Sequence, residues 1–166
     1  YAIVANRAGI FNTRIDLSSE VWRWKDNVLT DSGDHILARV RADVISAGHQ
    51  NLLIEHNIGA PRFRLRATSS KGNLYTMGQL SFTVNVLNAD CDHERYKLQR
   101  VNPFRRERVI SNEQGSVLRT RPRSDGSLTV TAADESAEEI PFFDAVFLSY
   151  GCVLIDGPGL KENIRI

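Results

Sequence analysis

Apolar and polar residues alternate with a period of two along most of the chain. In Arg62-Phe63-Arg64-Leu65-Arg66 both apolar residues share one side of an extended chain and the arginines share the other, and Ser81-Phe82-Thr83-Val84-Asn85-Val86 alternates in the same way. This period is typical of a sheet with one buried and one solvated face. It predicts strands over residues 21–25, 35–44, 52–56, 62–67, 79–87, 96–100, 108–111, 116–121 and 127–131.

Short groups rich in glycine, asparagine, aspartate and serine separate these segments. They occur at residues 31–34, 46–49, 69–73, 88–90, 111–115 and 124–127. Glycine, asparagine and aspartate tolerate the positive φ of tight turns, so each group predicts a hairpin connection. No long amphipathic segment lies between the strands to form a crossover helix. The strands are therefore predicted to form an antiparallel meander.

One segment near the C-terminal end breaks the alternation. Residues 142–155 are apolar nearly all round, with Asp144 as the exception. Pro141 suits the first turn of a helix, and Asp156-Gly157-Pro158-Gly159 suits its end. A helix is therefore predicted over about residues 141–155, and a helix without a polar face must be buried on every side. The apolar run is shorter than the roughly 20 residues that cross a bilayer.

Length and composition predict a single domain over residues 1–166. The chain has 42% hydrophobic and 25% charged residues, which is ordinary for a globular protein. Its two cysteines, Cys91 and Cys152, do not suggest a secreted disulfide framework. We therefore expect a reduced intracellular protein, either cytoplasmic or peripherally bound to a membrane.

Three segments resemble a known family. Residues 108–118, Arg-Val-Ile-Ser-Asn-Glu-Gln-Gly-Ser-Val-Leu, form a strand-turn-strand pattern, residues 28–37 look like a second copy of it, and residues 145–156 end in Leu-Ile-Asp. These segments are similar to parts of the tubby C-terminal-like superfamily, which includes phospholipid scramblases and LURP-one-related proteins. The resemblance implies a closed β-barrel around a central hydrophobic helix. We expect a mostly-β fold, an antiparallel barrel of about 10–12 strands enclosing the helix. The alternative is an antiparallel β-sandwich with one packed helix.

The chain also departs from the scramblases of that superfamily. It shows no proline-rich N-terminal segment, no cysteine cluster for palmitoylation and no acidic calcium-loop pattern beside the predicted helix. Scramblase activity is therefore not implied.

Positive charge is concentrated between residues 95 and 123, although the formal net charge of the chain is only +1. Arginine suits phosphate, and many tubby proteins bind phosphoinositides, so an anionic ligand is expected here. The candidate anion-binding residues are Arg100, Arg105, Arg106, Arg108, Arg119, Arg121 and Arg123. Candidate partners are a phosphoinositide headgroup, an anionic membrane surface, an acidic protein or a nucleic acid. The alternative is an ordinary solvated strand face balanced by the acidic residues 125–144.

Other chemically active residues give weaker signals. Trp22 and Trp24 share one face of a strand and are expected in the core, with an interface as the alternative. Asp90-Cys91-Asp92-His93 lacks the spacing of a structural zinc site and is interpreted as a polar turn without a metal. Asp144 must be paired or protonated if buried, and we expect it to meet an arginine or support the helix N-terminus.

No cofactor motif or catalytic motif is present in the sequence. The leading hypothesis is a non-enzymatic binding module for anionic phospholipid headgroups or an acidic partner. The alternative is a structural or assembly protein that serves as a protein–protein scaffold. Asp144 and the histidines His35, His49, His56 and His93 keep an enzyme open as a third class, because catalytic groups can converge from distant positions.

Overall fold

The computed structural model describes residues 14–57 and 62–157. The strands are β1 (Arg14–Ile15), β2 (Trp22–Lys25), β3 (Val28–Thr30), β4 (Ile36–Arg41), β5 (Val44–Ala47), β6 (Gln50–Asn57), β7 (Arg64–Ser69), β8 (Leu74–Gln79), β9 (Val86–Cys91), β10 (Glu94–Arg100), β11 (Arg108–Asn112), β12 (Gly115–Pro122), β13 (Leu128–Ala132) and β14 (Ile140–Pro141). The helix is α1 (Phe142–Asp156).

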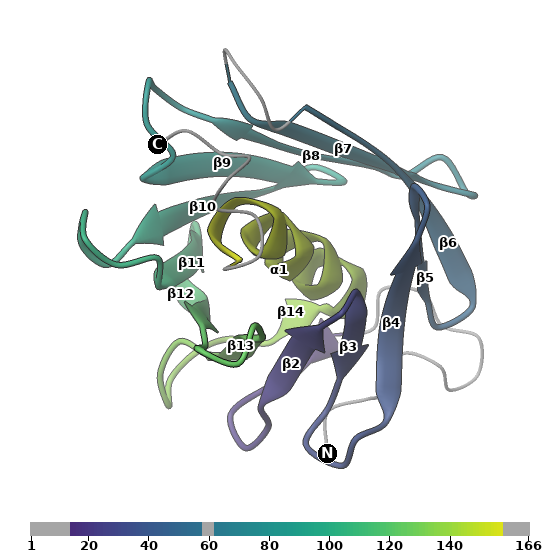
Figure 1. Ribbon diagram of the computed structural model, residues 1–166, viewed down its shortest axis with the longest axis horizontal. Helices are drawn as coiled ribbons and strands as arrows, with labels where there is room; N and C mark the ends of the chain where they lie inside the picture. The colour runs from purple at the N-terminus through teal and green to yellow at the C-terminus, as the bar shows by residue number, and fades with distance from the viewer. Residues whose placement is uncertain (1–13, 58–61, 158–166) are drawn as a thin grey trace.

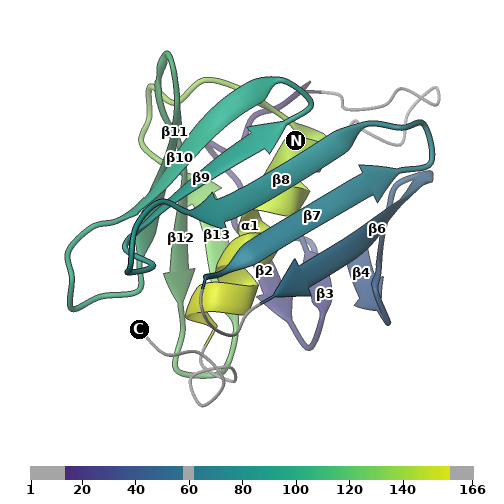
Figure 2. The same ribbon diagram turned by 90° about the horizontal axis from the view of Figure 1, so that it is seen from above.

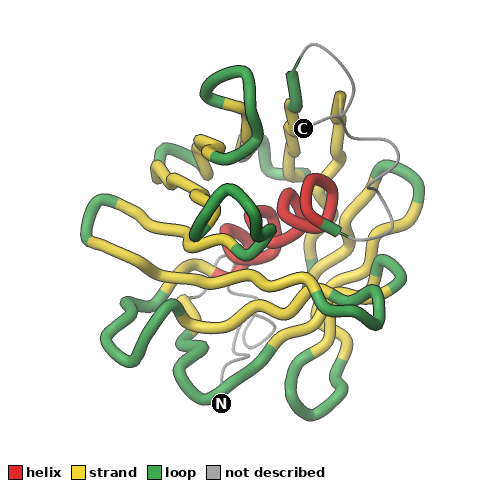
Figure 3. The backbone as a smooth tube through the Cα atoms, turned by 60° about the vertical axis from the view of Figure 1, so that its left-hand side comes forward, coloured by secondary structure: helices red, strands yellow, loops and turns green. Residues whose placement is uncertain are grey.

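Strands β2 to β13 close into an antiparallel barrel. Each strand pairs with its neighbours in sequence, and the ring closes where β13 pairs with β2, at Trp22↔Val130 and Trp24↔Leu128. Figures 1 and 3 show the strands arranged as a ring. A sandwich would leave open sheet edges, so the sandwich alternative is wrong. The predicted mostly-β barrel of about 10–12 strands is confirmed.

Helix α1 lies inside this ring (Figure 1), and every residue of α1 is buried except Val153, which is half-buried. The helix is buried in this way because its sequence is apolar all round, and a helix without a polar face is stable only where protein surrounds it. The predicted helix of about 141–155 is confirmed, with Pro141 as the residue just before its first turn. Gly157 follows its end, while Pro158 and Gly159 lie outside the described residues. Among the described helices, none has the length and apolar character that a membrane span requires.

Two tryptophans join the barrel wall to α1. Trp22 and Trp24 are 0% and 2% exposed, so the prediction that they belong to the core is confirmed. The Trp22 ring meets Phe142 edge to face with centroids 5.8 Å apart. The indole Nε1 of Trp24 donates a hydrogen bond of 2.8 Å to Ser149 Oγ, which places its polar atom on a partner inside the core.

Gly151 of α1 lies close to Met77 of β8. A Cβ atom at this position would collide with the Sδ and Cε atoms of Met77. The missing side chain of Gly151 therefore leaves room for the Met77 side chain, and α1 and β8 pack directly against each other.

The short strands β1 and β14 form a separate two-stranded sheet at the start of α1. Ile15 pairs with Ile140, and Arg14 pairs with Pro141. Ile15 and Ile140 are both 2% exposed, so this sheet covers the core where the helix begins. Neither strand was predicted, because two residues are too few to show alternation.

The predicted strand over residues 79–87 is wrong over most of its length. Strand β8 ends at Gln79 and β9 begins at Val86, so residues 80–85 form the loop between them. Val84 is buried, yet Phe82, which alternation places on the same face, is 91% exposed. The alternating sequence of residues 80–85 therefore belongs to a loop in which the Val84 side chain points into the core and the Phe82 side chain points into solvent.

The predicted turn at residues 88–90 is also displaced. These residues lie inside β9, and the hairpin turn falls at Asp92 and His93, whose φ angles are +51° and +80°. Two successive residues with positive φ make the tight turn that suits a twisted hairpin. The prediction of a turn at residues 88–90 is therefore wrong, and the turn is made by the next polar residues along the chain.

The antiparallel order gives the barrel two distinct ends. At one end the chain turns through residues 80–85, 101–107 and 123–127, and α1 ends at Asp156. At the other end the chain turns at residues 31–35, 70–73 and 92–93, and α1 begins. In Figure 2 the loops that join β8 to β9 and β10 to β11 lie on the side where α1 ends. We call the three segments 80–85, 101–107 and 123–127 the Asp156 rim.

Candidate anion-binding site

The seven predicted arginines do not form one surface. Arg100 and Arg108 are 7% and 0% exposed and lie under the end of α1. Arg119 and Arg121 lie on β12 and are partly exposed. The remaining three, Arg105, Arg106 and Arg123, belong to the Asp156 rim and are exposed or half-buried. The structure thus separates an inner arginine pair from an outer group of five.

The inner pair binds the last residue of α1. Arg108 donates hydrogen bonds from Nε to Asp156 Oδ2 and from Nη2 to Asp156 Oδ1, so the contact is bidentate. Arg100 Nη2 donates to Asp156 Oδ1 at 2.9 Å. Bidentate arginine–carboxylate pairs are the strong and directional form of this interaction. They offset the desolvation of three buried charges.

Arg108 also fixes the loop between β8 and β9. Its Nη2 donates to the carbonyl oxygen of Val84, and its Nη1 donates to those of Asn85 and Leu98 at 3.3 and 3.2 Å. One buried side chain therefore holds the helix end, strand β10 and residues 84–85 together. We assign Arg100 and Arg108 a structural position in the rim, beneath the residues that reach solvent.

Sequence periodicity contains the signal that separates Arg100 and Arg108 from the other arginines. Arg100 lies an even number of positions from Tyr96 and Leu98, so the three side chains share one face of β10, and all three are buried. Arg108 shares the parity of Ile110 on β11. Because side chains alternate between the two faces of a strand, this parity places both arginines inside the barrel.

Glu107 organises two of the outer arginines. Its Oε2 accepts hydrogen bonds from Arg119 Nη1 at 2.7 Å and from Arg121 Nη2 at 3.1 Å. The Glu107 side chain is 8% exposed, whereas those of Arg119 and Arg121 are 34% and 46% exposed. Burial alone raises the pKa of Glu107, but the two arginine hydrogen bonds outweigh it and hold this pKa below its usual range. A carboxylate that stays ionised keeps both guanidinium groups in place.

An open cavity of about 410 Å³ lies on the Asp156 rim. Arg105, Arg106, Glu107, Arg121 and Pro122 line it. Arg106 Nη1 lies 3.5 Å from the carbonyl oxygen of Asp156, at the negative end of the helix dipole. The cavity therefore brings together three of the predicted arginines, with Arg119 held beside it by Glu107. We call these residues, Arg105, Arg106, Glu107, Arg119 and Arg121, the arginine site.

Arg123 stands in the neighbouring turn at residues 123–127. Its backbone N–H donates to the carbonyl oxygen of Ser127 at 2.7 Å, and its side chain does not line the cavity. Asp125 in the same turn accepts a hydrogen bond of 2.6 Å from Ser127 Oγ. Arg123 therefore adds positive charge near the arginine site without being part of it.

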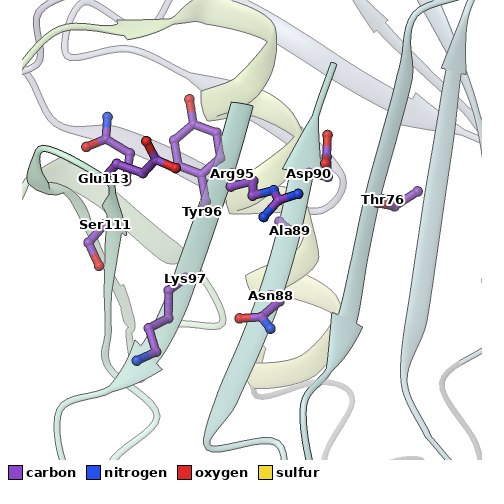
Figure 4. A pocket seen from close by; sticks show the side chains of 10 residues that line it. Thr76, Asn88, Ala89, Asp90, Arg95, Tyr96, Lys97, Ser111 and Glu113 are labelled. Carbon is purple, nitrogen blue, oxygen red and sulfur yellow. The ribbon is translucent and has the colours of Figure 1, made fainter. Parts of the chain in front are cut away.

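A larger cavity, of about 630 Å³, crosses the outer face of strands β8 to β11. Figure 4 shows it lined by side chains of both charges, with Arg95 and Lys97 from β10, Asp90 from β9 and Glu113 beyond β11. Arg95 and Asp90 are directly opposed on paired strands. Because carboxylates balance the cations, this cavity offers an anion less net attraction than the arginine site does.

The buried carboxylate near the start of α1 meets a tyrosine. Tyr96 donates a hydrogen bond of 2.6 Å from its hydroxyl to Asp144 Oδ2, and Asp144 is 1% exposed. Burial and the charge of Asp144 raise the pKa of Tyr96 above its usual range, so the hydroxyl keeps its proton and remains a donor. Asp144 lies in the first turn of α1, the position expected of a carboxylate that supports the helix N-terminus. At the other end of the helix, Asp156 binds Arg100 and Arg108.

The expected polar turn at residues 90–93 is half strand and half turn. Cys91 ends β9 with its side chain buried, and only Asp92 and His93 form the turn. Burial raises the pKa of the Cys91 thiol, and that of Cys152 to about 12. In the described part of the chain, no three side chains of His, Cys, Asp or Glu come together as a metal site.

Comparison with models of protein families, with curated proteins and with solved structures gave no match to this chain. The arginine site is the feature of the described structure that points most directly to a function.

Proposed function

We propose that this protein is a non-enzymatic binding module that holds anionic phospholipid headgroups at the arginine site. The observation that supports it is the cavity lined by Arg105, Arg106 and Arg121. Guanidinium groups are planar donors that match phosphate oxygens in pairs, and they keep their charge at any physiological pH.

The carboxylates near the site support this proposal by their small number. Two carboxylates face five guanidinium groups in this region, so cationic charge is in excess. The carboxylates are Glu107 and Asp125, and the arginines are Arg105, Arg106, Arg119, Arg121 and Arg123. Glu107 neutralises only part of that charge while it positions two of the arginines. Positioned cations lose little conformational freedom on binding, which favours affinity for a compact dianion such as a phosphate monoester.

The fold supports a place for this chain in the tubby-like superfamily, which we include in the proposal. A closed barrel around a C-terminal hydrophobic helix is the architecture that the resemblance of residues 108–118 and 145–156 implies. Many tubby proteins bind phosphoinositides, and the arginine site offers chemistry suited to the same ligand. Membrane association and an intracellular location follow from this proposal.

Vesicle co-sedimentation tests the proposal. We expect more protein to sediment with phosphatidylcholine vesicles that contain a phosphoinositide than with phosphatidylcholine alone. The variant Arg105→Glu/Arg106→Glu should lose most of this difference. The matched control is Arg39→Glu/Arg41→Glu, which reverses two exposed charges on β4. Equal recovery of the wild-type protein on both kinds of vesicle would refute the proposal.

A further inference from the structure

Two neighbouring loops of the Asp156 rim expose large apolar side chains. Phe82 and Phe104 are 91% and 96% exposed, and Leu80 and Val101 in the same loops are 55% and 41% exposed. Single exposed apolar residues are common on protein surfaces, but phenylalanine is among the residues most often buried. Two nearly fully exposed phenyl rings on adjacent loops therefore need an explanation.

Hydrogen bonds hold both loops in place. Phe104 N–H donates to Asn102 Oδ1 at 2.8 Å, and Val101 N–H donates to the carbonyl oxygen of Glu107 at 3.0 Å. In the other loop, Gln79 Nε2 donates to the carbonyl oxygen of Ser81 at 2.9 Å. Arg108 binds the carbonyl oxygens at the end of that loop. The backbone thus presents both rings outward from the barrel while the loops stay attached to it.

Cationic side chains stand beside both rings. Phe104 directly precedes Arg105 and Arg106 of the arginine site. The guanidinium carbon of Arg62 lies 5.7 Å from the centroid of the Phe82 ring. Exposed apolar side chains and cations therefore share the same end of the barrel.

We infer that the Asp156 rim docks on the surface of an anionic bilayer, with Phe82 and Phe104 inserted between the lipids and Arg105 and Arg106 on their phosphates. This inference rests on the proposed function and names the lipid surface as the source of the phosphate. Aromatic and basic residues together match a bilayer interface, where apolar chains lie just below negative headgroups.

The arrangement of these side chains favours a bilayer over a protein partner. Protein interfaces are depleted of charge at their centre, and their aromatic anchors fill pockets there. Here Arg62 lies over the Phe82 ring, Phe104 directly precedes Arg105 in sequence, and the two rings occupy separate loops. A bilayer receives separated apolar tips and surrounding cations at the same time, because it is fluid.

Two binding measurements separate the inference from the proposed function. The variant Phe82→Ser/Phe104→Ser should weaken binding to phosphoinositide-containing vesicles about tenfold or more, because two phenyl rings no longer leave water. Its affinity for a soluble inositol phosphate should match that of the wild type, because the arginine site is intact. Arg105→Glu/Arg106→Glu should weaken both. The matched control Ile36→Ser/Leu74→Ser removes two exposed apolar side chains at the other barrel end and should weaken neither.

Each outcome has a distinct meaning. If the phenylalanine variant binds vesicles as tightly as the wild type, the docking inference is overturned while the proposed function stands. If the wild type binds neither vesicles nor soluble inositol phosphate, the proposed function fails and the inference fails with it. If the wild type forms a stable oligomer that the phenylalanine variant does not form, and vesicles have no effect on either, the rim contacts protein and the inference is overturned.

Tryptophan fluorescence gives an independent readout of insertion. Phe82→Trp and Phe104→Trp place reporters at the rim, whereas the native Trp22 and Trp24 are buried in the core. We expect a blue shift of the added tryptophan on anionic vesicles and quenching by brominated lipid chains. Ile36→Trp at the other end is the control and should show neither effect. Rim reporters that behave like this control would overturn the inference.

Discussion

At the scale of single residues, the most consequential contact is the one between Arg108 and Asp156. Both side chains are 0% exposed, and Arg108 supplies hydrogen bonds to the helix end and to three backbone carbonyls. A buried charge is stable only while its partners remain. The end of α1 and the base of the Asp156 rim therefore depend on one guanidinium group.

The substitution Arg108→Met should destabilise the protein strongly. The methionine side chain would fill a similar volume but leave the Asp156 carboxylate with Arg100 alone. It would also remove a donor from the carbonyl groups of Val84, Asn85 and Leu98, of which that of Asn85 still accepts from the Arg100 N–H. Breaking a buried ion pair in this way costs about 3–5 kcal/mol. Urea unfolding measures the change, and Arg39→Met on the exposed face of β4 is the control, with an expected change within about 0.5 kcal/mol. A change for Arg108→Met no larger than that of the control would contradict the assigned position.

Glu107 should make the stability of the barrel depend on acid pH. Its pKa in the folded protein is lowered by Arg119 and Arg121, so the unfolded chain takes up its proton at a higher pH than the folded protein does. The stabilisation is therefore present above the unfolded pKa of about 4.3 and is lost as the pH falls through the folded pKa. The difference in unfolding free energy between wild type and Glu107→Gln should shrink in acid. An exposed carboxylate at Glu113 gives the matched control, and a difference that does not change with pH would oppose this account.

At the scale of elements, α1 was the easiest part of the structure to predict and the rim loops were the hardest. An all-round apolar helix has one physical solution, enclosure, and the sequence shows its limits at Pro141 and Gly157. The loop 80–85 imitates a strand because its polar and apolar residues happen to alternate. The shape of this loop depends on Arg108, which is distant in sequence and binds the carbonyl groups of Val84 and Asn85.

The arginines illustrate the same limit. Local composition marks a stretch rich in arginine, and the alternation of side chains along the strands could have separated Arg100 and Arg108 from the rest. Nothing local shows that Asp156 receives Arg100 and Arg108, because those contacts depend on how α1 is threaded through the barrel. The pairing of Glu107 with Arg119 and Arg121 likewise follows from the register of β11 and β12.

The contact between α1 and β8 leads to a prediction whose sign changes with background. Gly151→Ala should destabilise the wild-type protein by about 1–3 kcal/mol, because the new Cβ collides with Met77 in a full core. In a Met77→Ala background the same substitution should stabilise, because alanine favours a helix by about 1 kcal/mol over glycine and the collision is gone. A double-mutant cycle by urea unfolding measures both. Equal effects in the two backgrounds would show that Gly151 and Met77 are not coupled.

At the scale of the whole molecule, the barrel is closed by a contact between its first and last strands. Trp22 of β2 pairs with Val130 of β13, and Trp22 and Trp24 also pack against Phe142 and Tyr150 of α1. The environment of both tryptophans is therefore complete only when the ring has closed around the helix. The stability of the protein and the closure of the barrel therefore both depend on the seam, the pairing of β2 with β13.

This geometry predicts slow folding that the tryptophans report. Contacts distant in sequence slow folding because loop entropy is lost before the contact forms, so we expect refolding in milliseconds to seconds. The native tryptophan fluorescence should appear in the slowest phase of stopped-flow refolding, after most secondary structure has formed by far-ultraviolet circular dichroism. Native fluorescence that appears in microseconds would contradict late closure of the seam.

The order of elements along the chain has a further consequence during protein synthesis. Domains assemble from the N-terminus as the ribosome extends the chain. Strands β2 to β12 emerge before β13, so β2 has no partner on one side, and they emerge before α1, so the inner face of the sheet has no cover. Unpaired edges and uncovered apolar faces are where chains aggregate and where chaperones bind. For this protein, the nascent chain is most vulnerable until residues 128–156 have left the ribosome.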